Sequence, residues 1–249
     1  MKERLKISAQ KILIIVPAYN EQASIAKTLR ELVDFKGNHE LSAIVDICVI
    51  NDGSVDKTEE IVREMGEVIL IDLPLNLGIG GAVQTGYKYA NSNHYDLAIQ
   101  YDADGQHKST ELQKIIQPVL AGECDLCIGG RFVEKTSYKG SFQRRMGIFY
   151  FEKMIKLLTR VRVTDSTSGF RCVNQKVISI FAKDYPRDYP EPEVIIMLYK
   201  KGLKIKEVAV EMVAREMGES SITPWKSVYY MLKVSLSILV RKIEKGAVR

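Results

Sequence analysis

Two carboxylates one residue apart mark the first place in this chain where chemistry is expected. Asp102 and Asp104 directly follow the apolar run 97–101, and Gly105 lets the backbone turn behind them. Carboxylate oxygens suit Mg²⁺ or Mn²⁺ that also binds phosphate oxygens, and Gln106 offers a third, neutral oxygen. A solvated acidic turn that caps the next helix has the same spacing, so spacing alone leaves both interpretations open.

Polar residues also end the first two apolar runs. Asp52 follows the second run, and because capping of the next helix does not explain it, we expect it to accept hydrogen bonds from a base N–H or a ribose hydroxyl. After the first run, Pro17, Tyr19 and Glu21 form a rigid corner whose aromatic ring either stacks on a base or packs.

A glycine-rich stretch, residues 75–82, opens a predicted helix and contains Gly80. It follows the third apolar run instead of the first, lacks the full G-x-G-x-x-G spacing and has no Gly-Lys-Ser/Thr ending. The sequence therefore argues against dinucleotide-binding and P-loop proteins. Close packing of the helix on a sheet is the simpler explanation for Gly81 and Ala82.

Several arginines could bind phosphate through their guanidinium groups. Arg131, after the fifth apolar run, is the one we expect to do so, whereas we expect Arg144 and Arg171 to be surface charges or ion-pair partners. The loop 218–221 contains no basic residue and offers only neutral donors. The further candidates for an acceptor phosphate are Arg145, Arg215 and Ser221.

Glu191 and Glu193 stand between prolines in the segment YPEPE. The prolines stiffen this loop, so either carboxylate could serve as a general base for a hydroxyl acceptor. Solvated acids ahead of a helix are an equally good explanation.

A sheet must position these residues. Five β-branched runs alternate with helix-period segments up to about residue 130, which is the pattern of a parallel α/β sheet. Ligands of such sheets bind at the carboxyl ends of the strands, where the candidate residues stand. Farther along, residues 164–171 predict a polar turn and 204–213 a strand. The five runs are 11–16, 44–50, 67–71, 97–101 and 125–129.

The composition is that of a globular protein. The 249 residues are 46% hydrophobic and 27% charged, enough apolar mass for one sizeable core. A net charge of +5 is too mild to indicate nucleic acid as a partner, and four cysteines rule out a disulfide scaffold. Because no linker divides the chain, we expect one domain, 1–222, followed by a C-terminal amphipathic helix, 223–249.

Contact with a membrane is expected from two basic-aromatic segments, 143–162 and the C-terminal helix. Both resemble interfacial helices that face anionic headgroups, although packing on the core or a homo-oligomer seam would give the same stripes. The apolar run before Pro17 is too short for a secretory signal, and no stretch reaches the roughly 20 apolar residues that span a bilayer. We therefore expect a cytoplasmic protein on the inner face of the cell membrane.

Six short motifs occur in a specific order: PAYNE, NDGS-x-D-x-T, NLGIGGA, DADGQH, GGR and SGFR. Together they resemble an inverting family-2 glycosyltransferase of the nucleotide-diphospho-sugar transferase (GT-A) fold, close to the dolichol-phosphate mannose synthase-like branch. The resemblance covers roughly residues 11–222 and implies an α/β fold with a central, mostly parallel sheet flanked by helices.

The resemblance also implies roles for single residues. The corner at residues 17–21 and Asp52 would hold the nucleoside, Asp102 the ribose or a metal, and Asp104 with Gln106 the metal on the diphosphate. Asp104 and Arg131, with Glu191 and Glu193, are the expected catalytic residues. The residues expected at the nucleotide-sugar are Pro17, Tyr19, Glu21, Asp52, Gly80, Asp102 and Ala103.

The expected reaction is metal-dependent, inverting transfer of a hexose from a nucleotide-diphospho-sugar to a polyprenyl phosphate, with a UDP-sugar favoured over a GDP-sugar and Mg²⁺ or Mn²⁺ as cofactor. The alternative acceptor is a sugar hydroxyl of a cell-surface polysaccharide or lipid-linked glycan. A nucleotidyltransferase normally starts with a glycine-rich phosphate loop on the first strand, where this chain has PAYNE. An idle nucleotide-binding module is disfavoured because both acids of the pair are present.

Overall fold

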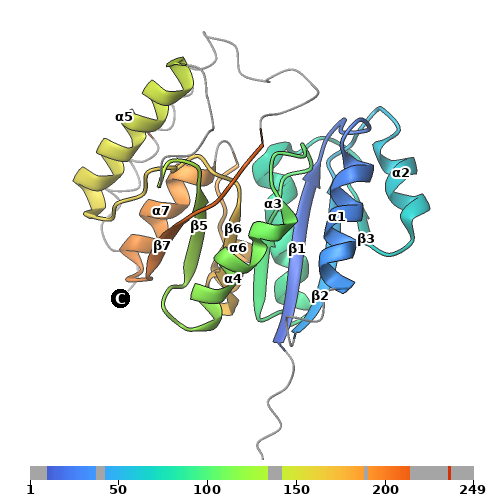
Figure 1. The fold of residues 1–249 in the computed structure, drawn as a ribbon, viewed down its shortest axis with the longest axis horizontal. Coiled ribbons are helices and arrows are strands. Elements are labelled where there is room, and N and C mark those ends of the chain that lie inside the picture. The colour runs from blue at the N-terminus through green and yellow to red at the C-terminus, as the bar shows by residue number, and fades with distance from the viewer. Residues whose placement is uncertain (1–9, 38–42, 134–141, 188–189, 214–234, 237–249) are drawn as a thin grey trace, which may run out of the picture.

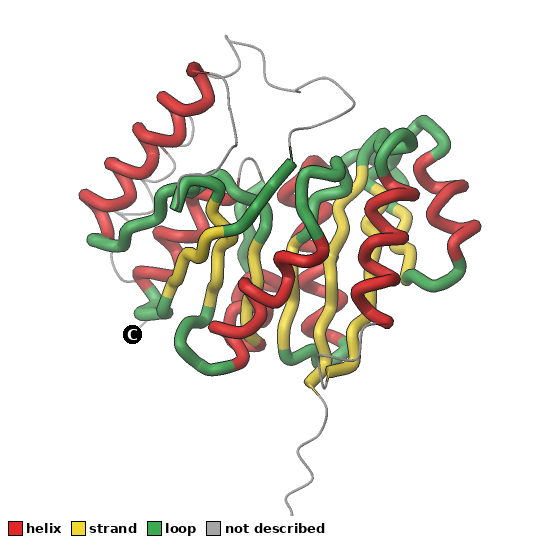
Figure 2. Tube along the Cα trace, viewed as in Figure 1, coloured by secondary structure: helices red, strands yellow, loops and turns green. Residues whose placement is uncertain are grey.

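A seven-stranded sheet forms the centre of the structure, and helices cover both of its faces (Figures 1 and 2). The structure, a computed structural model, describes residues 10–37, 43–133, 142–187, 190–213 and 235–236. The strands are β1 (Gln10–Ala18), β2 (Ala43–Asn51), β3 (Ile69–Asp72), β4 (Leu97–Gln100), β5 (Leu126–Gly130), β6 (Arg171–Asn174) and β7 (Ile205–Ala209). The helices are α1 (Ile25–Gly37), α2 (Thr58–Met65), α3 (Gly78–Ser92), α4 (Leu112–Leu120), α5 (Phe142–Thr159), α6 (Gln175–Lys183) and α7 (Pro190–Lys200), with a short 3₁₀ turn at Ser109–Glu111.

The sheet is mostly parallel, as the sequence predicts. Its strand order is β3-β2-β1-β4-β6-β5-β7, and only β6 runs antiparallel to its neighbours β4 and β5. Each of the five predicted apolar runs overlaps a strand, and β7 lies inside the predicted strand 204–213. The predicted polar turn at 164–171 is wrong at its last residue, because β6 begins at Arg171. A strand of four residues that starts with a charged residue gives too short a pattern to recognise.

Burial on both faces explains why β1 is a continuous apolar run. Side chains alternate along a strand, so Leu13 and Ile15 pack with α3, α6 and α7, while Ile12 and Ile14 pack with α1, α2 and α4. All four side chains are fully buried. Each contributes roughly 1.5–3 kcal/mol relative to an exposed position.

Glycine lets α3 approach the sheet closely. A Cβ on Gly86 would collide with Ile15 of β1, so this position sets the distance between helix and strand. Ala82 is buried in the same core, as predicted. A Cβ on Gly81 would instead meet the side chain of Leu77, so the prediction that Gly81 packs on the sheet is wrong.

The structure also bears on the cysteines, on membrane spanning and on the predicted C-terminal helix. All four cysteines are free and buried. Among the described residues, none of the helices has the length and hydropathy needed to cross a membrane. The predicted C-terminal helix, 223–249, lies outside the described residues except for Ser235 and Leu236, and the division at residue 222 stays a prediction.

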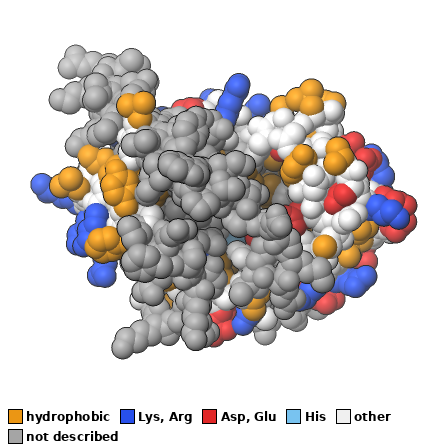
Figure 3. All heavy atoms as spheres, turned by 90° about the horizontal axis from the view of Figure 1, so that it is seen from above, with side chains coloured by type: hydrophobic (Ala, Val, Ile, Leu, Met, Phe, Trp, Pro, Cys, Tyr) orange, Lys and Arg blue, Asp and Glu red, His pale blue; other side chains and the backbone are white. Residues whose placement is uncertain are grey.

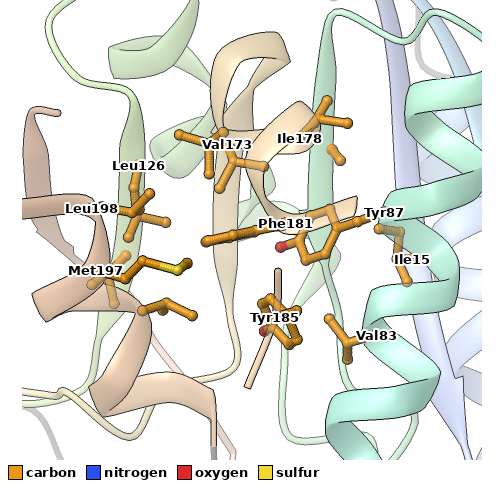
Figure 4. Packing of buried hydrophobic residues seen from close by; sticks show 14 of the residues in the cluster. Ile15, Val83, Tyr87, Leu126, Val173, Ile178, Phe181, Tyr185, Met197 and Leu198 are labelled. Carbon is orange, nitrogen blue, oxygen red and sulfur yellow. The ribbon is translucent and has the colours of Figure 1, made fainter. Parts of the chain in front are cut away.

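An aromatic cluster fills the space between α3, α6 and α7 (Figure 4). The ring centroids of Tyr87 and Phe181 lie 4.9 Å apart, and the ring of Tyr185 lies 5.5 Å from that of Tyr87. The Tyr87 hydroxyl is buried without a hydrogen-bond partner. A buried polar group in that state costs about 1–3 kcal/mol.

We therefore expect Tyr87→Phe to stabilise the protein, raising the free energy of unfolding by about 1 kcal/mol. Chemical denaturation of the purified variant measures this change. Tyr95→Phe is the matched control and should destabilise, because the Tyr95 hydroxyl donates a 2.8 Å hydrogen bond to Asp46. A loss of stability in Tyr87→Phe as large as that in the control would contradict the assignment.

Candidate active site

The carboxyl ends of β1, β2 and β4 meet at one edge of the sheet, at the top in Figure 1. Figure 3 looks down on this edge. The loops that follow these three strands carry most of the predicted site residues. Parallel pairing therefore brings together residues that lie far apart in the sequence.

The loop after β1 is tied to the loop after β2 by hydrogen bonds. Asn20 donates its N–H to Ser54 Oγ (3.0 Å) and accepts at its Oδ1 from the N–H of Val55 (2.9 Å). The N–H of Glu21 donates to Thr58 Oγ1 (2.8 Å). Asn20 has a φ of 55°, a left-handed conformation that asparagine adopts more readily than most residues. The corner is thus rigid because a neighbouring loop holds it.

The predicted nucleoside residues of this corner have different positions. Pro17 is buried within β1, opposite Ile50 of β2, so the prediction that it lies in the corner is wrong. Tyr19 is 48% exposed at the edge, where its ring can stack on a base. Glu21 accepts a hydrogen bond from Ser24 Oγ (2.8 Å).

Asp52 is a helix-capping carboxylate, against the prediction that capping does not explain it. Its side chain is buried, and Oδ1 accepts from the N–H of Leu77 (2.7 Å), the residue before α3. Burial raises the pKa of Asp52, while hydrogen bonds from the backbone of Leu77 and Gly78 oppose that rise. Capping therefore does explain this residue, through α3 instead of α2, and its contact with a nucleoside stays a prediction.

Gly80 serves a close backbone contact. Its N–H donates to the carbonyl of Arg187 (3.2 Å), and a Cβ at this position would collide with the carbonyls of Pro186 and Arg187. Because this N–H already donates within the protein, a contact of Gly80 with the nucleotide-sugar stays a prediction that would have to use another group. The absence of a side chain brings the loop after α6 against α3.

Asp102 and Asp104 are partly exposed just beyond β4. Asp102 Oδ1 accepts from Gln100 Nε2 (3.2 Å), and Asp104 Oδ1 accepts from the N–H of Gln106 (3.1 Å). A Cβ on Gly169 would lie 2.6 Å from Asp102 Oδ2. Only glycine at 169 therefore leaves room for the Asp102 carboxylate in this orientation.

His107 supports the acidic pair from below. Its Nδ1 accepts from the N–H of Asp102 (3.2 Å), and its Nε2 lies 3.7 Å from Asp102 Oδ2. The ring packs on Phe170 and Tyr101. Burial lowers the pKa of His107 to about 4, so the imidazole is neutral at physiological pH.

Ala103, between the two acids, faces inward. Its side chain is buried in the core and its carbonyl accepts from Thr28 Oγ1 (3.2 Å). These two groups are therefore turned away from a ligand, and a contact of Ala103 with the nucleotide-sugar through its N–H stays a prediction.

The donor set at β4 fits a divalent cation shared with a phosphate ligand. Two carboxylates and the amide side chain of Gln106 are hard oxygen ligands, and Mg²⁺ is usually bound by one or two carboxylates together with substrate phosphates. No group of three or more His, Cys, Asp or Glu side chains that could hold a metal occurs in the part of the chain that the structure describes. The chemistry of these oxygen ligands thus suits a cation that binds together with a phosphate-containing substrate.

Arg131 forms a buried ion pair, against the prediction that it is not an ion-pair arginine. Its Nε and Nη2 donate to the two carboxylate oxygens of Asp165 (2.6 and 2.8 Å). Glu207 of β7 supports this pair, because its carboxylate accepts from the N–H groups of Thr164 and Asp165, both at 2.7 Å. A phosphate would have to bind Arg131 alongside Asp165.

Arg171 begins β6, and Glu191 and Glu193 lie in the first turn of α7, so the prediction that these two glutamates stand in a loop ahead of the helix is wrong. Arg171 is only 1% exposed, so the prediction of a surface position is wrong. Glu193 is buried, against the alternative of a solvated turn acid. Burial raises the pKa of Glu191 to about 7, with the Arg171 charge opposing and the Asp102 charge reinforcing the rise. Glu191 therefore has the proton affinity expected of a general acid or base at neutral pH.

Some predicted phosphate residues lie outside the described part of the chain. These are Arg215, Ser221 and the side chain of Arg145. The side chain of Arg144, predicted as a surface charge or an ion-pair partner, lies outside it too. Sequence reasoning also missed Asp165, Gly169 and Glu207. The first two stand in the polar segment before β6, which was the available signal, whereas nothing in the alternating strand 204–213 distinguishes Glu207.

The pKa of Glu191 predicts a pH-dependent effect on stability. Between the ordinary value of 4.5 and about 7, only the folded protein retains the proton, so the free energy of unfolding falls as pH rises through this window. Glu191→Gln removes that loss. Thermal melts should show the variant gaining stability over the wild type from pH 5 to pH 8, and an equal difference at both pH values would show that the carboxyl titrates normally.

Comparison with known proteins agrees with this arrangement. The family model for glycosyl transferase family 2 matches residues 13–181. An uncharacterized protein of Methanocaldococcus jannaschii is 33% identical, with 96% of this chain and 95% of that protein covered. A UDP-N-acetylglucosamine–dolichyl-phosphate N-acetylglucosaminyltransferase of Methanococcus voltae is 28% identical over 90% of this chain and 96% of its own length. A polyprenol monophosphomannose synthase of Mycolicibacterium smegmatis is 26% identical over 86% and 82%.

Among solved structures, glucosyl-3-phosphoglycerate synthase from Mycobacterium tuberculosis, in complex with Mn²⁺, UDP-glucose and phosphoglyceric acid, is similar with a TM-score of 0.70. The two chains are 18% identical, and the match covers 96% of this chain and 81% of that one. The similarity in structure gives the fold, which is GT-A, as the motifs implied. Since the family model spans more than half of the residues, the chain belongs to glycosyltransferase family 2.

Proposed function

We propose that this glycosyltransferase moves a hexose from a nucleotide-diphospho-sugar, a UDP-sugar in preference to a GDP-sugar, to a polyprenyl phosphate. The part of this proposal that concerns the sugar donor rests on one observation, the pair Asp102 and Asp104 at the carboxyl end of β4. Support for the acceptor comes from two relatives whose names contain a dolichyl phosphate or a polyprenol monophosphomannose.

The reaction is a displacement at the anomeric carbon. The acceptor oxygen forms the new bond on one face while the bond to the nucleoside diphosphate breaks on the other, which inverts the configuration. A bound Mg²⁺ or Mn²⁺ would neutralise the departing diphosphate. Asp102, Asp104 and Gln106 would hold it, with Gln100, His107 and Gly169 fixing the Asp102 carboxylate.

A phosphate acceptor needs no general base. The second pKa of a phosphate monoester is about 6, so its oxygen is already anionic at neutral pH. The protein then has to position the acceptor and to exclude water.

Glu191 favours a second candidate, transfer to a sugar hydroxyl. A hydroxyl must lose its proton, and a carboxyl with a pKa of about 7 close to Asp102 is suited to accept it. In this alternative, loss of the required carboxylate, Glu191 or Glu193, lowers the rate about a hundredfold or more. The polyprenyl phosphate reaction instead continues without either carboxylate, at no less than about a tenth of the rate.

Membrane attachment belongs to the same proposal, with the protein on the cytoplasmic face. On α5, Phe149 and Leu157 are 58% and 83% exposed, and the exposed Lys153 lies over the Phe149 ring. Figure 3 shows hydrophobic and basic side chains gathering on the side where α5 lies. The opposite face of α5, which includes Phe151, is buried. Packing on the core therefore explains one face of this helix, and membrane contact is proposed for the other.

Turnover tests the reaction directly. Purified protein is incubated with UDP- or GDP-hexoses, Mn²⁺ and a short polyprenyl phosphate, and both nucleotide release and glycolipid are measured. We expect metal-dependent glycolipid, and at least about a hundredfold loss in Asp104→Ala, because the charge on the departing diphosphate loses a fixed partner. Asp34→Ala on the exposed surface of α1 is the control. Full activity of Asp104→Ala would refute the mechanism, and metal-dependent nucleotide binding without glycolipid would favour the hydroxyl acceptor.

Co-sedimentation with vesicles tests the membrane surface. The double variant Phe149→Ser/Leu157→Ser should bind vesicles containing anionic lipid at least about tenfold more weakly, since two large apolar side chains no longer enter the interface. Val55→Ser is matched to it, because Val55 is apolar and 87% exposed but lies in the loop after β2. Equal binding by all three proteins would exclude α5 as the contact.

A further inference from the structure

Arg171 is among the largest fully buried side chains of the described residues, and its guanidinium makes an unusual set of hydrogen bonds. Nε donates to the carbonyl of Ser168 (2.7 Å) and Nη2 to the carbonyl of Ser166 (3.0 Å). Nη1 donates to the carbonyl of Glu191 (2.9 Å). One side chain therefore joins the turn before β6 to the first turn of α7.

The same residue stands next to the acidic pair. Arg171 lies directly opposite Gln100 in the antiparallel pairing of β4 and β6, and Gln100 donates to Asp102 (3.2 Å). Gly169, two residues before Arg171, leaves the space that the Asp102 carboxylate occupies. The β6 start thus borders the Asp102 loop on one side and the Glu191 turn on the other.

Stability alone does not account for this arginine. A cation at the first turn of a helix opposes the helix dipole, and burying a guanidinium is costly unless its donors are satisfied. Two other buried side-chain atoms close to it, Gln100 Oε1 and Ser166 Oγ, have no hydrogen-bond partner. An apolar residue in this place would leave the carbonyls of Ser166, Ser168 and Glu191 without these donors, so the arginine is explained by the geometry that its fork imposes on the two turns.

We propose that Arg171 is a positioning residue of the active site, which fixes the first turn of α7 so that the Glu191 carboxyl faces the Asp102 side of the site. This inference rests on the proposed glycosyl transfer and deepens it. Without the guanidinium fork, the turn before β6 and the start of α7 lose their common anchor, and Glu191 loses its fixed place relative to the donor.

A double-mutant cycle tests the proposal. If Arg171 acts through Glu191, then Arg171→Met and Glu191→Gln should each lower kcat about tenfold, and the double variant should be no worse than about tenfold. Arg171→Lys, which keeps the charge but loses the planar fork, should fall between wild type and Arg171→Met. The affinity for UDP with Mn²⁺, measured by calorimetry, should stay unchanged in all of them.

Asn174→Ala is the matched structural control, because it lies at the far end of the same strand. Asn174 Oδ1 caps α6 by accepting from the N–H of Val177 (3.2 Å), and Nδ2 donates to Asp125 (2.7 Å). This variant should lose stability without losing kcat. If Arg171→Met does not fold, the cycle is run with Arg171→Lys.

Three results would overturn the proposal: an unchanged kcat in Arg171→Met, an unchanged kcat in Glu191→Gln, or a double variant that loses the product of the two single effects. The cycle is read as nucleotide release in the presence of the acceptor that supports turnover by the wild type. Failure of the proposed acceptor would instead appear in the wild type, as metal-dependent nucleotide binding without glycolipid.

Discussion

A buried charge must have partners, and in this protein the partners are largely backbone groups of the loops around the site. The Asp52 carboxylate accepts from the N–H before α3, and Glu207 accepts from two N–H groups of the turn before β6. The Arg171 guanidinium donates to three carbonyls. Each of these charges therefore fixes a loop, and the loops carry the residues that would meet the substrates.

The antiparallel strand β6 makes this arrangement possible. Because β6 runs against β4, its first residue stands at the edge where the parallel strands end. A parallel strand in that place would have put Arg171 at the opposite edge, away from Asp102 and Glu191. Among the described strands, β6 is the exception to the parallel pattern, and it brings the second half of the chain into the site.

The sequence allowed the parallel part of the fold to be predicted because continuous apolar runs and helical stripes are local signals. The roles of Asp52 and Arg131 were harder, since a sequence shows that a polar residue ends a strand but not which neighbour faces it. Asp52 meets α3, and Arg131 meets Asp165, a residue 34 positions away. Both partners are set by tertiary packing. Glu191 could be selected because its flanking prolines predict a stiff loop, but the segment forms the first turn of α7. The raised pKa of Glu191 depends on burial that no local pattern encodes.

The protonation of Glu191 bears on both acceptors. A carboxyl with a pKa of about 7 is divided between its two forms at neutral pH, so it can accept a proton from a hydroxyl. For an anionic phosphate, the same carboxyl is useful in the opposite way. Asp102 and Asp104 already place negative charge in the site, and an acceptor dianion would add more. A Glu191 that takes up a proton as the anion approaches removes one repulsion without moving the chain, because like charges raise a carboxyl pKa further. The position of Glu191 near Asp102 is therefore compatible with a phosphate acceptor, and the burial that makes it a base also lets it become neutral.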